Sequence, residues 1–263
     1  MSKRLKKIAS FLGIYRVAKR AEKYLYDILN TNIIKQNKKK ELTFYSSLIK
    51  PGQLCFDVGA NIGDKSEIFL KLGARVVALE PQSDCVRKLT KRFRSNKDLT
   101  VIEKGLSNTN GTLSLSISST ENTISTMSDQ WKEKGRFSNK YSEGRTINVE
   151  VSTLDDLVKD YGSPDYIKID VEGFEFNVLK GLSSPVKLIS FEFVSEFFDD
   201  AKKCIEYLST FGQIRLNAVL GLPEKFIFES FLDPEAFLTQ IKEIMNNETC
   251  GDIFVKIENP INA

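Results

Sequence analysis

Residues 55–63 read Cys-Phe-Asp-Val-Gly-Ala-Asn-Ile-Gly, an apolar run that passes into a turn bounded by two glycines. A strand, a glycine turn and a following amphipathic stretch predict the first βα unit of an open α/β sheet, which binds ligands at the carboxyl ends of its strands. Gly59 and Gly63 allow close approach of the backbone to a ligand. Their spacing is G-x-x-x-G, which is neither the G-x-G-x-x-G of dinucleotide folds nor a P-loop. The turn therefore disfavours a diphosphate cradle.

Apolar runs and amphipathic stretches alternate along the rest of the chain. Strands are predicted at residues 53–58, 75–79, 99–103, 165–169 and 186–193. Helices are predicted at residues 64–72, 82–95, 153–160, 174–180 and 199–210. Two later apolar runs, 213–219 and 252–257, flank a helix at 233–246 and predict an antiparallel pair at the sheet edge. This order predicts one α/β domain over residues 46–263, with a mainly parallel sheet covered by helices on both faces.

Residues 119–145 interrupt the alternation. The segment is rich in Ser, Thr, Asn and Lys and carries Trp131, Phe137 and Tyr141. Strand-like runs at 112–118 and 146–151 flank it, so we expect an excursion carried by a hairpin. A connection of this length in a compact domain is often functional. We interpret it as a substrate loop, with anchoring of the loop to the domain as the alternative role of its aromatic residues.

The composition excludes several classes of enzyme. The 263 residues contain no histidine, which removes Ser-His-Asp and Cys-His catalysis, histidine metal sites and a histidine general base. The four cysteines form no CxxC pair, so they fit a reducing cytoplasm and no structural zinc site. No apolar run approaches the roughly 20 residues of a membrane span. The first residues lack the apolar region of a secretory signal, and we expect a cytoplasmic protein.

Charge is distributed unevenly along the chain. Residues 1–40 carry 12 Lys and Arg against Glu22 and Asp27, a net charge of +10, and the remainder, with 26 basic and 33 acidic residues, has −7. Apolar positions at near-helical spacing predict a basic amphipathic helix at 3–29, within an extension over residues 1–45. The helix either packs on its own domain, or docks peripherally on the inner membrane face or a partner, or contacts nucleic acid.

Two carboxylates indicate the kind of cofactor. Asp57 lies inside the glycine turn, where a negative charge suits an ammonium group better than a pyrophosphate. Glu80 ends the second predicted strand, where a carboxylate can accept hydrogen bonds from both hydroxyls of a ribose. Together they predict a nucleoside cofactor with a cationic amino-acid tail. S-adenosylmethionine fits that description better than NAD.

A second pair of carboxylates follows the strand at 165–169. Residues 166–175 read Tyr-Ile-Lys-Ile-Asp-Val-Glu-Gly-Phe-Glu, which puts Asp170 and Glu172 at the strand tip. Without a histidine, either is a natural general base for a hydroxyl acceptor. The pair could instead hold Mg²⁺. Glu172 could also be a first-turn acid of the next helix, and Asp170 a merely structural carboxylate.

The sequence resembles the FkbM-type S-adenosylmethionine-dependent methyltransferases. The resemblance covers about residues 50–195, and its matching stretches are 56–63, 78–81, 152–155, 167–175 and 178–181. It implies a Rossmann-like class I methyltransferase fold: a mainly parallel seven-stranded sheet with helices on both faces and an antiparallel C-terminal edge strand. It also implies O-methylation, in a family associated with hydroxyls of natural products, sugars and glycan chains.

The resemblance assigns roles to individual residues. It implies that the methionine end of the cofactor is held by Asp57, Gly59, Asn61 and Gly63. It implies that Glu80 binds the ribose, and that the end of the third strand, at Gly105 and Leu106, lies near the adenine. Asp170 and Glu172 would face the transferring methyl group, so that Asp170 also contacts the cofactor. Glu192 would approach the acceptor from the next strand, or would be a buried, hydrogen-bonded core residue.

The leading hypothesis is therefore an S-adenosylmethionine-dependent O-methyltransferase acting on a hydroxyl of a sugar, glycan or natural-product-like acceptor. A catalytically inactive cofactor-binding module that acts through a partner is the first alternative. An RNA methyltransferase is the second, although the chain lacks an Asn-Pro-Pro-Tyr motif and the negative main domain would repel phosphate. An NAD oxidoreductase is disfavoured by the glycine spacing.

Overall fold

The computed structural model describes residues 33–118, 125–135, 138, 144–222 and 224–260. The chain divides into two units, residues 1–41 and residues 42–263, and the elements described below belong to the second. The predicted amphipathic helix at 3–29 lies outside the described residues. In the part of the chain that the structure describes, no helix is both long and apolar enough to cross a membrane.

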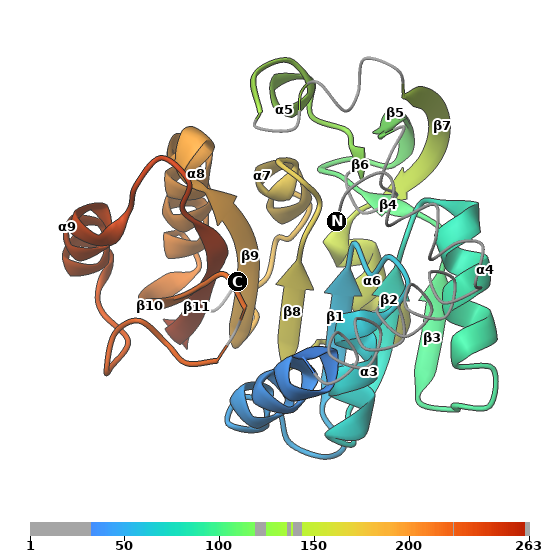
Figure 1. The fold of residues 1–263 in the computed structure, drawn as a ribbon, viewed down its shortest axis with the longest axis horizontal. Coiled ribbons are helices and arrows are strands. Elements are labelled where there is room, and N and C mark those ends of the chain that lie inside the picture. The colour runs from blue at the N-terminus through green and yellow to red at the C-terminus, as the bar shows by residue number, and fades with distance from the viewer. Residues whose placement is uncertain (1–32, 119–124, 136–137, 139–143, 223, 261–263) are drawn as a thin grey trace, which may run out of the picture. The chain divides into compact units, whose positions relative to one another are not determined.

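A seven-stranded sheet forms the centre of the second unit (Figure 1). Its order is β3-β2-β1-β8-β9-β11-β10. These strands are β1 (Leu54–Val58), β2 (Arg75–Leu79), β3 (Leu99–Ile102), β8 (Tyr166–Ile169), β9 (Leu188–Val194), β10 (Gly212–Leu220) and β11 (Cys250–Pro260). β11 runs antiparallel to both of its neighbours, β9 and β10, and the other pairs of strands in this sheet are parallel. The predicted parallel sheet with an antiparallel C-terminal pair at one edge is confirmed, with β11 one place in from the edge and β10 outermost.

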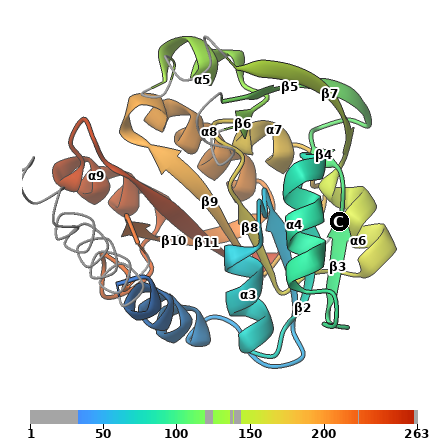
Figure 2. The ribbon, with the colours of Figure 1, turned by 45° about the vertical axis from the view of Figure 1, so that its right-hand side comes forward.

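Helices cover both faces of this sheet, as predicted (Figure 2). They are α3 (Asp64–Lys71), α4 (Ser83–Arg92), α6 (Leu154–Tyr161), α7 (Glu175–Leu179), α8 (Phe198–Ser209) and α9 (Pro234–Ile244). The apolar residues of α6, α7, α8 and α9 share one core with Phe56 and Ile167, and those of α3 and α4 share another with Cys55 and Tyr166. Because successive side chains of a strand point to opposite faces, β1 and β8 contribute to both cores.

A second sheet of four strands lies beyond the carboxyl ends of β1 and β8 (Figures 1 and 2). Its order is β4-β7-β5-β6. The strands are β4 (Gly105–Leu106), β5 (Gly111–Ile117), β6 (Ser125–Thr126) and β7 (Arg145–Ser152). The antiparallel pairing of β5 with β7 is the hairpin predicted from the sequence.

The described part of the segment 119–145 is more ordered than the predicted loop. It contains β6 and the short helix α5 (Asp129–Lys134). Ser128 caps α5 by accepting a hydrogen bond from the backbone N–H of Trp131 at 3.2 Å. Trp131 is buried, which ties α5 to the domain. Phe137 and Tyr141 lie outside the described residues.

Candidate active site

The turn after β1 approaches the turn after β8 so closely that Gly59 has no room for a side chain. Its φ is +80°, and an added Cβ would lie 1.9 Å from the carbonyl oxygen of Asp170. Gly63, with φ +83°, begins α3, and a Cβ there would lie 2.8 Å from a ring carbon of Phe93. Asn61 between them also has a positive φ, of +50°. The turn requires residues that tolerate a left-handed backbone conformation at these three positions, and glycine and asparagine do so most readily.

Asp57 is buried behind this turn. Its Oδ2 accepts a hydrogen bond of 2.6 Å from the hydroxyl of Ser66 on α3. Across the sheet it lies opposite Lys168 of β8. Burial raises the pKa of Asp57, while the Lys168 ammonium and the Ser66 hydrogen bond lower it. The turn therefore carries a carboxylate that its neighbours partly stabilise in the charged form.

Glu80 follows β2 and is held by backbone donors on both sides. Its Oε2 accepts a hydrogen bond from the N–H of Asn61 and its Oε1 one from the N–H of Gln82, each at 2.9 Å. Burial raises the pKa of Glu80 and these hydrogen bonds oppose that shift. Each carboxylate oxygen can accept a further hydrogen bond, so the two oxygens fit the two hydroxyls of a ribose. The residues present therefore fit S-adenosylmethionine at this edge.

Gly105 and Leu106 lie just after β3 but belong to the second sheet. As β4 they pair with Val151 and Ser152 of β7. The side chain of Leu106 is fully buried in the main core, and a Cβ on Gly105 would lie 3.1 Å from Met127. Only their backbone is thus placed to contact a cofactor.

The turn between β8 and α7 carries the next two carboxylates. The N–H of Asp170 donates to the carbonyl of Val58 at 3.0 Å, which joins this turn to the end of β1. Glu175, in the first turn of α7, accepts hydrogen bonds from the N–H groups of Val171 and Gly173 at 3.0 and 3.2 Å. The acid that braces this turn is therefore Glu175.

Glu172 adopts an unusual backbone conformation in the same turn. Its φ is +54°, and its carbonyl accepts a hydrogen bond of 2.6 Å from the hydroxyl of Thr126 on β6. The alternative interpretation of Glu172 as a first-turn acid of the next helix is wrong, because Phe174 is the N-cap residue of α7 and Glu175 is the acid in its first turn. Left-handed non-glycine residues often mark functional sites.

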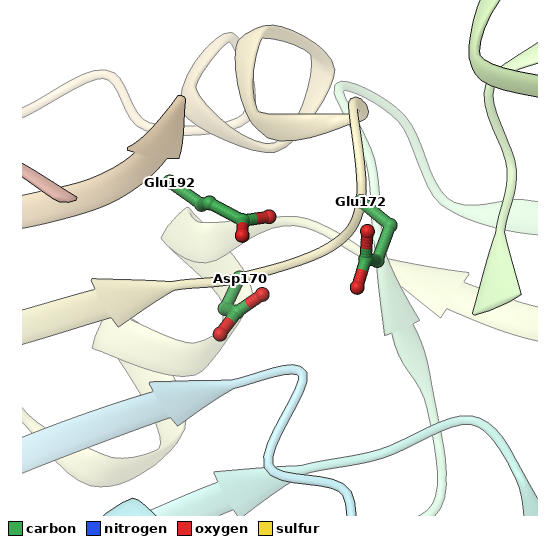
Figure 3. A group of neighbouring side chains, drawn as sticks. All are labelled: Asp170, Glu172 and Glu192. Carbon is green, nitrogen blue, oxygen red and sulfur yellow. The ribbon is translucent and has the colours of Figure 1, made fainter. Parts of the chain in front are cut away.

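Three carboxylates converge at the ends of β8 and β9. Oxygens of Asp170, Glu172 and Glu192 all lie within 4.8 Å of one another, and Figure 3 shows the three groups turned toward a common space. Burial, then the charges of Asp170 and Glu175, raise the pKa of Glu172 to about 9. Burial and the neighbouring carboxylates, Asp170 first among them, raise the pKa of Glu192 well above its ordinary value. The structure thus brings the three predicted catalytic residues together.

Glu192 is not the hydrogen-bonded core residue that we considered as an alternative. Its Oε2 is completely buried and has no hydrogen-bond partner among the residues that the structure describes. A buried acceptor without a donor is uncommon in folded proteins. This oxygen is therefore available to a ligand.

Lys168 supplies a positive charge beside the cluster. Its Nζ lies 2.7 Å from Oδ2 of Asp170, and its side chain is 2% exposed. Burial lowers the pKa of Lys168, but Asp170, Asp252 and Asp57 together raise it well above its ordinary value. Asp170 directly follows β8, two residues after Lys168, and the hydrogen bond between them shows that both side chains lie on the same side of the sheet.

A cavity of about 220 Å³ borders the cluster, lined by Trp131, Glu192, Phe176, Phe197, Asn177 and Lys203 among others. The ring of Trp131 lies against Gly173, where an added Cβ would come within 2.6 Å of it, and 5.6 Å from the ring of Phe197. The indole N–H of Trp131 is buried and has no acceptor within the described ranges. The cavity therefore has an unpaired donor and an unpaired acceptor among its lining residues.

Sequence reasoning did not include Lys168 and Glu175 among the site residues, and it left open whether Trp131 contacts the site or anchors its loop. Lys168 carries the one available signal, a charged residue inside an apolar strand, since such a residue is seldom buried without a partner. Glu175 cannot be told from Glu172 by sequence, because both acids fit the turn. Trp131 reaches the cavity only through the packing of α5.

Comparisons with known proteins identify the family. A model of the FkbM methyltransferase domain matches residues 57–217. Hexuronic acid methyltransferase AglP of Haloferax volcanii is 28% identical over 142 residues, 53% of this chain and 54% of that protein. Methyltransferase sdnD of Sordaria araneosa is 28% identical over 153 residues, 48% of this chain and 59% of that protein. The chain thus matches little more than half the length of these relatives.

Solved structures give a more distant likeness. Precorrin-6y C5,15-methyltransferase of Geobacter metallireducens has a TM-score of 0.44 at 14% identity, covering 82% of this chain and 87% of that one. A likeness at this level says nothing about activity. The family match covers more than half of the residues, including both glycine turns and all three converging carboxylates, and the chain belongs to the FkbM family of methyltransferases.

Proposed function

We propose that the protein is an S-adenosylmethionine-dependent O-methyltransferase whose acceptor is a hydroxyl of a sugar, glycan or natural-product-like molecule. The observation that carries this proposal is the convergence of Asp170, Glu172 and Glu192 between the glycine turn and the cavity. A hydroxyl must lose its proton as it is methylated, and carboxylates are the bases at hand in a chain without histidine. The hexuronic acid named for the relative AglP supports a sugar acceptor.

The cofactor would lie along the carboxyl ends of β1 and β2. S-adenosylmethionine, when bound, supplies a methyl carbon that its sulfonium makes electrophilic. The turn from Gly59 to Gly63, with Asn61, would hold the methionine end, and Asp57 would face its ammonium group. Glu80, fixed by two backbone N–H groups, would bind the ribose hydroxyls. The backbone of Gly105 and Leu106 would border the adenine.

The acceptor would enter the cavity beside the cluster. Trp131 and Phe197 offer aromatic surface to the apolar face of a sugar ring, and the unpaired indole N–H can donate to an acceptor oxygen. The cavity would hold the acceptor in a fixed orientation beside the cluster, and such positioning is the main contribution a methyltransferase must make.

We assign the removal of the hydroxyl proton to the carboxylate cluster. Lys168 holds Asp170 in an ion pair at 2.7 Å, which fixes the position of the Asp170 carboxylate beside the acceptor. With a pKa of about 9, Glu172 is largely protonated at neutral pH. Its capacity to accept a proton therefore rises as the pH increases toward that value.

Calorimetric titration with S-adenosylhomocysteine, with NAD as the control ligand, is the first test. We expect micromolar binding of S-adenosylhomocysteine alone, weakened at least about tenfold by Glu80→Gln, since that change removes a charged acceptor from two hydroxyls. Transfer of a labelled methyl group to hydroxylated acceptors follows. Asp170→Asn should abolish this transfer and the exposed Asp160→Asn should not.

Two outcomes would oppose the proposal. Absence of S-adenosylhomocysteine binding would remove the assigned cofactor. Binding without transfer to any acceptor, in wild type and variants alike, would favour the inactive cofactor-binding module. Near-normal transfer by Asp170→Asn would leave the methyltransferase intact but remove the role given to that carboxylate.

We also propose a cytoplasmic location, peripheral at the inner membrane face. The net charge of +10 over residues 1–40 supports it, since clustered Lys and Arg are attracted to anionic lipid headgroups. The acceptor would then be a glycan or other intermediate assembled at that surface.

A further inference from the structure

We propose that Asp170, Glu172 and Glu192 together bind a hard divalent cation such as Mg²⁺ or Mn²⁺. Asp170 and Glu172 come from the turn between β8 and α7, and Glu192 comes from strand β9, so the fold brings Glu192 to the other two (Figure 3). All three offer carboxylate oxygens, the ligands that such cations prefer. The inference deepens the proposed function, since the cation would lie where the acceptor hydroxyl is methylated.

The spacing of the ligand atoms suits one ion. One oxygen from each residue lies within 4.8 Å of the other two. Oxygens on opposite sides of a bound ion are about 4.2 Å apart for Mg²⁺ and about 4.8 Å apart for Ca²⁺, because the bonds are about 2.1 and 2.4 Å long. The three groups could therefore close on one cation through small side-chain adjustments.

A second observation, independent of the spacing, is the state of Glu192. Oε2 of Glu192 is buried and meets no donor in the described part of the chain. The carboxyl group points toward Asp170 and Glu172 (Figure 3). A buried carboxylate oxygen directed at two other carboxylates requires a proton or a cation.

The charges around the cluster also favour a cation. Glu175 and Asp252 add to the negative potential at Glu192. At Glu172, the positive charge of Lys168 offsets part of the negative charge of the neighbouring carboxylates. The Nζ of Lys168, however, donates a hydrogen bond to Oδ2 of Asp170. The two oxygens of Glu192 and those of Glu172 thus have no comparable ion pair within the described residues.

The cation would select a class of acceptor. Three protein ligands leave about three positions of a six-coordinate ion open, and the cavity that borders Glu192 gives access to them. Two neighbouring acceptor oxygens can fill two of these positions. The acceptor class is therefore a vicinal diol or a hydroxy acid, and binding to the cation would acidify the hydroxyl that is methylated.

Binding of Mn²⁺ to the full-length, chelator-treated protein, followed by electron paramagnetic resonance, tests the cation site directly. We expect one saturable Mn²⁺ site per chain from which Mg²⁺ displaces the probe. Glu192→Gln, which keeps the shape of the side chain, should weaken Mn²⁺ binding at least tenfold. The matched control is Glu206→Gln, an exposed carboxylate on α8, which should leave binding within twofold of wild type.

Three results would overturn the inference: no saturable Mn²⁺ site, equal Mn²⁺ affinity in wild type and Glu192→Gln, or methyl transfer that is undiminished in excess chelator. If Glu192→Gln does not fold, Glu172→Gln takes its place in the comparison. Titration with S-adenosylhomocysteine separates this inference from the proposed function. Binding of that ligand without a Mn²⁺ site rejects the cation alone, and a Mn²⁺ site without that binding rejects the assigned cofactor alone.

Discussion

At the scale of single residues, backbone conformations that side chains tolerate poorly are concentrated beside the site. Gly59, Asn61 and Gly63 in the first turn, and Glu172 and Gly173 in the second, all have positive φ. The two turns are held edge to edge by the hydrogen bond from Asp170 to Val58. Strain of this kind persists only where the surrounding structure fixes it, so we expect substitutions here to affect stability and binding together.

Gly59→Ala tests this coupling, and Gly52→Ala is its matched control. Both glycines have a φ near +80°, but a Cβ on Gly52 meets nothing within 4 Å, whereas one on Gly59 lies 1.9 Å from the Asp170 carbonyl. Gly52→Ala should lower the free energy of unfolding by about 1–2 kcal/mol, the backbone contribution alone. Gly59→Ala should lower it by about 2–5 kcal/mol, because overpacking adds to that contribution.

Chemical denaturation of both variants, with S-adenosylhomocysteine titration of each, gives the comparison. Gly59→Ala should also weaken the binding of S-adenosylhomocysteine, and Gly52→Ala should leave it unchanged. Equal losses in the free energy of unfolding would mean that the turn after β1 can move away from the turn after β8 without a loss of stability.

At the scale of elements, α5 is a helix of six residues whose main apolar contact is Trp131. Its Trp131 packs on Gly173 in the turn after β8, and Thr126 of the preceding strand β6 donates a hydrogen bond to the Glu172 carbonyl in the same turn. Trp131 thus lines the cavity and also packs on the turn that carries Asp170 and Glu172.

Trp131→Phe and Trp131→Ala separate these two contributions. Phenylalanine keeps an aromatic ring and removes the indole N–H, so the melting temperature should change little. The KM for the acceptor should rise about five- to tenfold, because one hydrogen bond that contributes about 1 kcal/mol to acceptor binding is lost. Alanine should lower the free energy of unfolding by about 3–5 kcal/mol.

Steady-state kinetics and thermal melting of the two variants provide the measurements. The affinity for S-adenosylhomocysteine is the internal control, since Trp131 has no assigned contact with the cofactor. An unchanged acceptor KM in Trp131→Phe would show that the indole N–H takes no part in acceptor binding.

The elements differ in how far sequence could predict them. The boundaries of β1, β2 and α3 were predictable because an apolar run, a glycine turn and an amphipathic stretch follow in order. β4 and β6 have two residues each, too few for any periodicity to show. The sequence predicted that Asp170 and Glu172 lie close together, because both follow the same strand. Sequence placed Trp131 in an expected substrate loop but left open whether its ring faces the site or anchors the loop, because that depends on long-range packing.

At the scale of the whole molecule, charge separates along the chain. Residues 1–40 have a net charge of +10 and the remaining residues one of −7. The segment that carries the positive charge lies mostly in residues 1–32, outside the described part. The net charge of this segment supports its proposed role in membrane binding, and vesicle binding by the full-length protein tests that role.

The full-length protein should sediment with vesicles that contain anionic lipid, and high salt should release it, because screening weakens surface electrostatics. Replacing Lys3, Arg4, Lys6 and Lys7 by glutamine should weaken vesicle binding at least about tenfold. The matched control replaces four exposed basic residues of the second unit by glutamine: Lys88, Lys91, Arg94 and Lys97. Equal effects of the two sets, or no vesicle binding, would contradict the proposed location.

The position of β11 in the sheet has a consequence for biosynthesis. β10 pairs with no strand of the sheet except β11, and β9 meets β11 on one side. As the nascent chain leaves the ribosome, β10 emerges before β11, and both β9 and β10 then present open edges that can recruit other chains. The sheet is completed only after residues 250–260 have been translated, so the interval before that is when the protein depends most on chaperones.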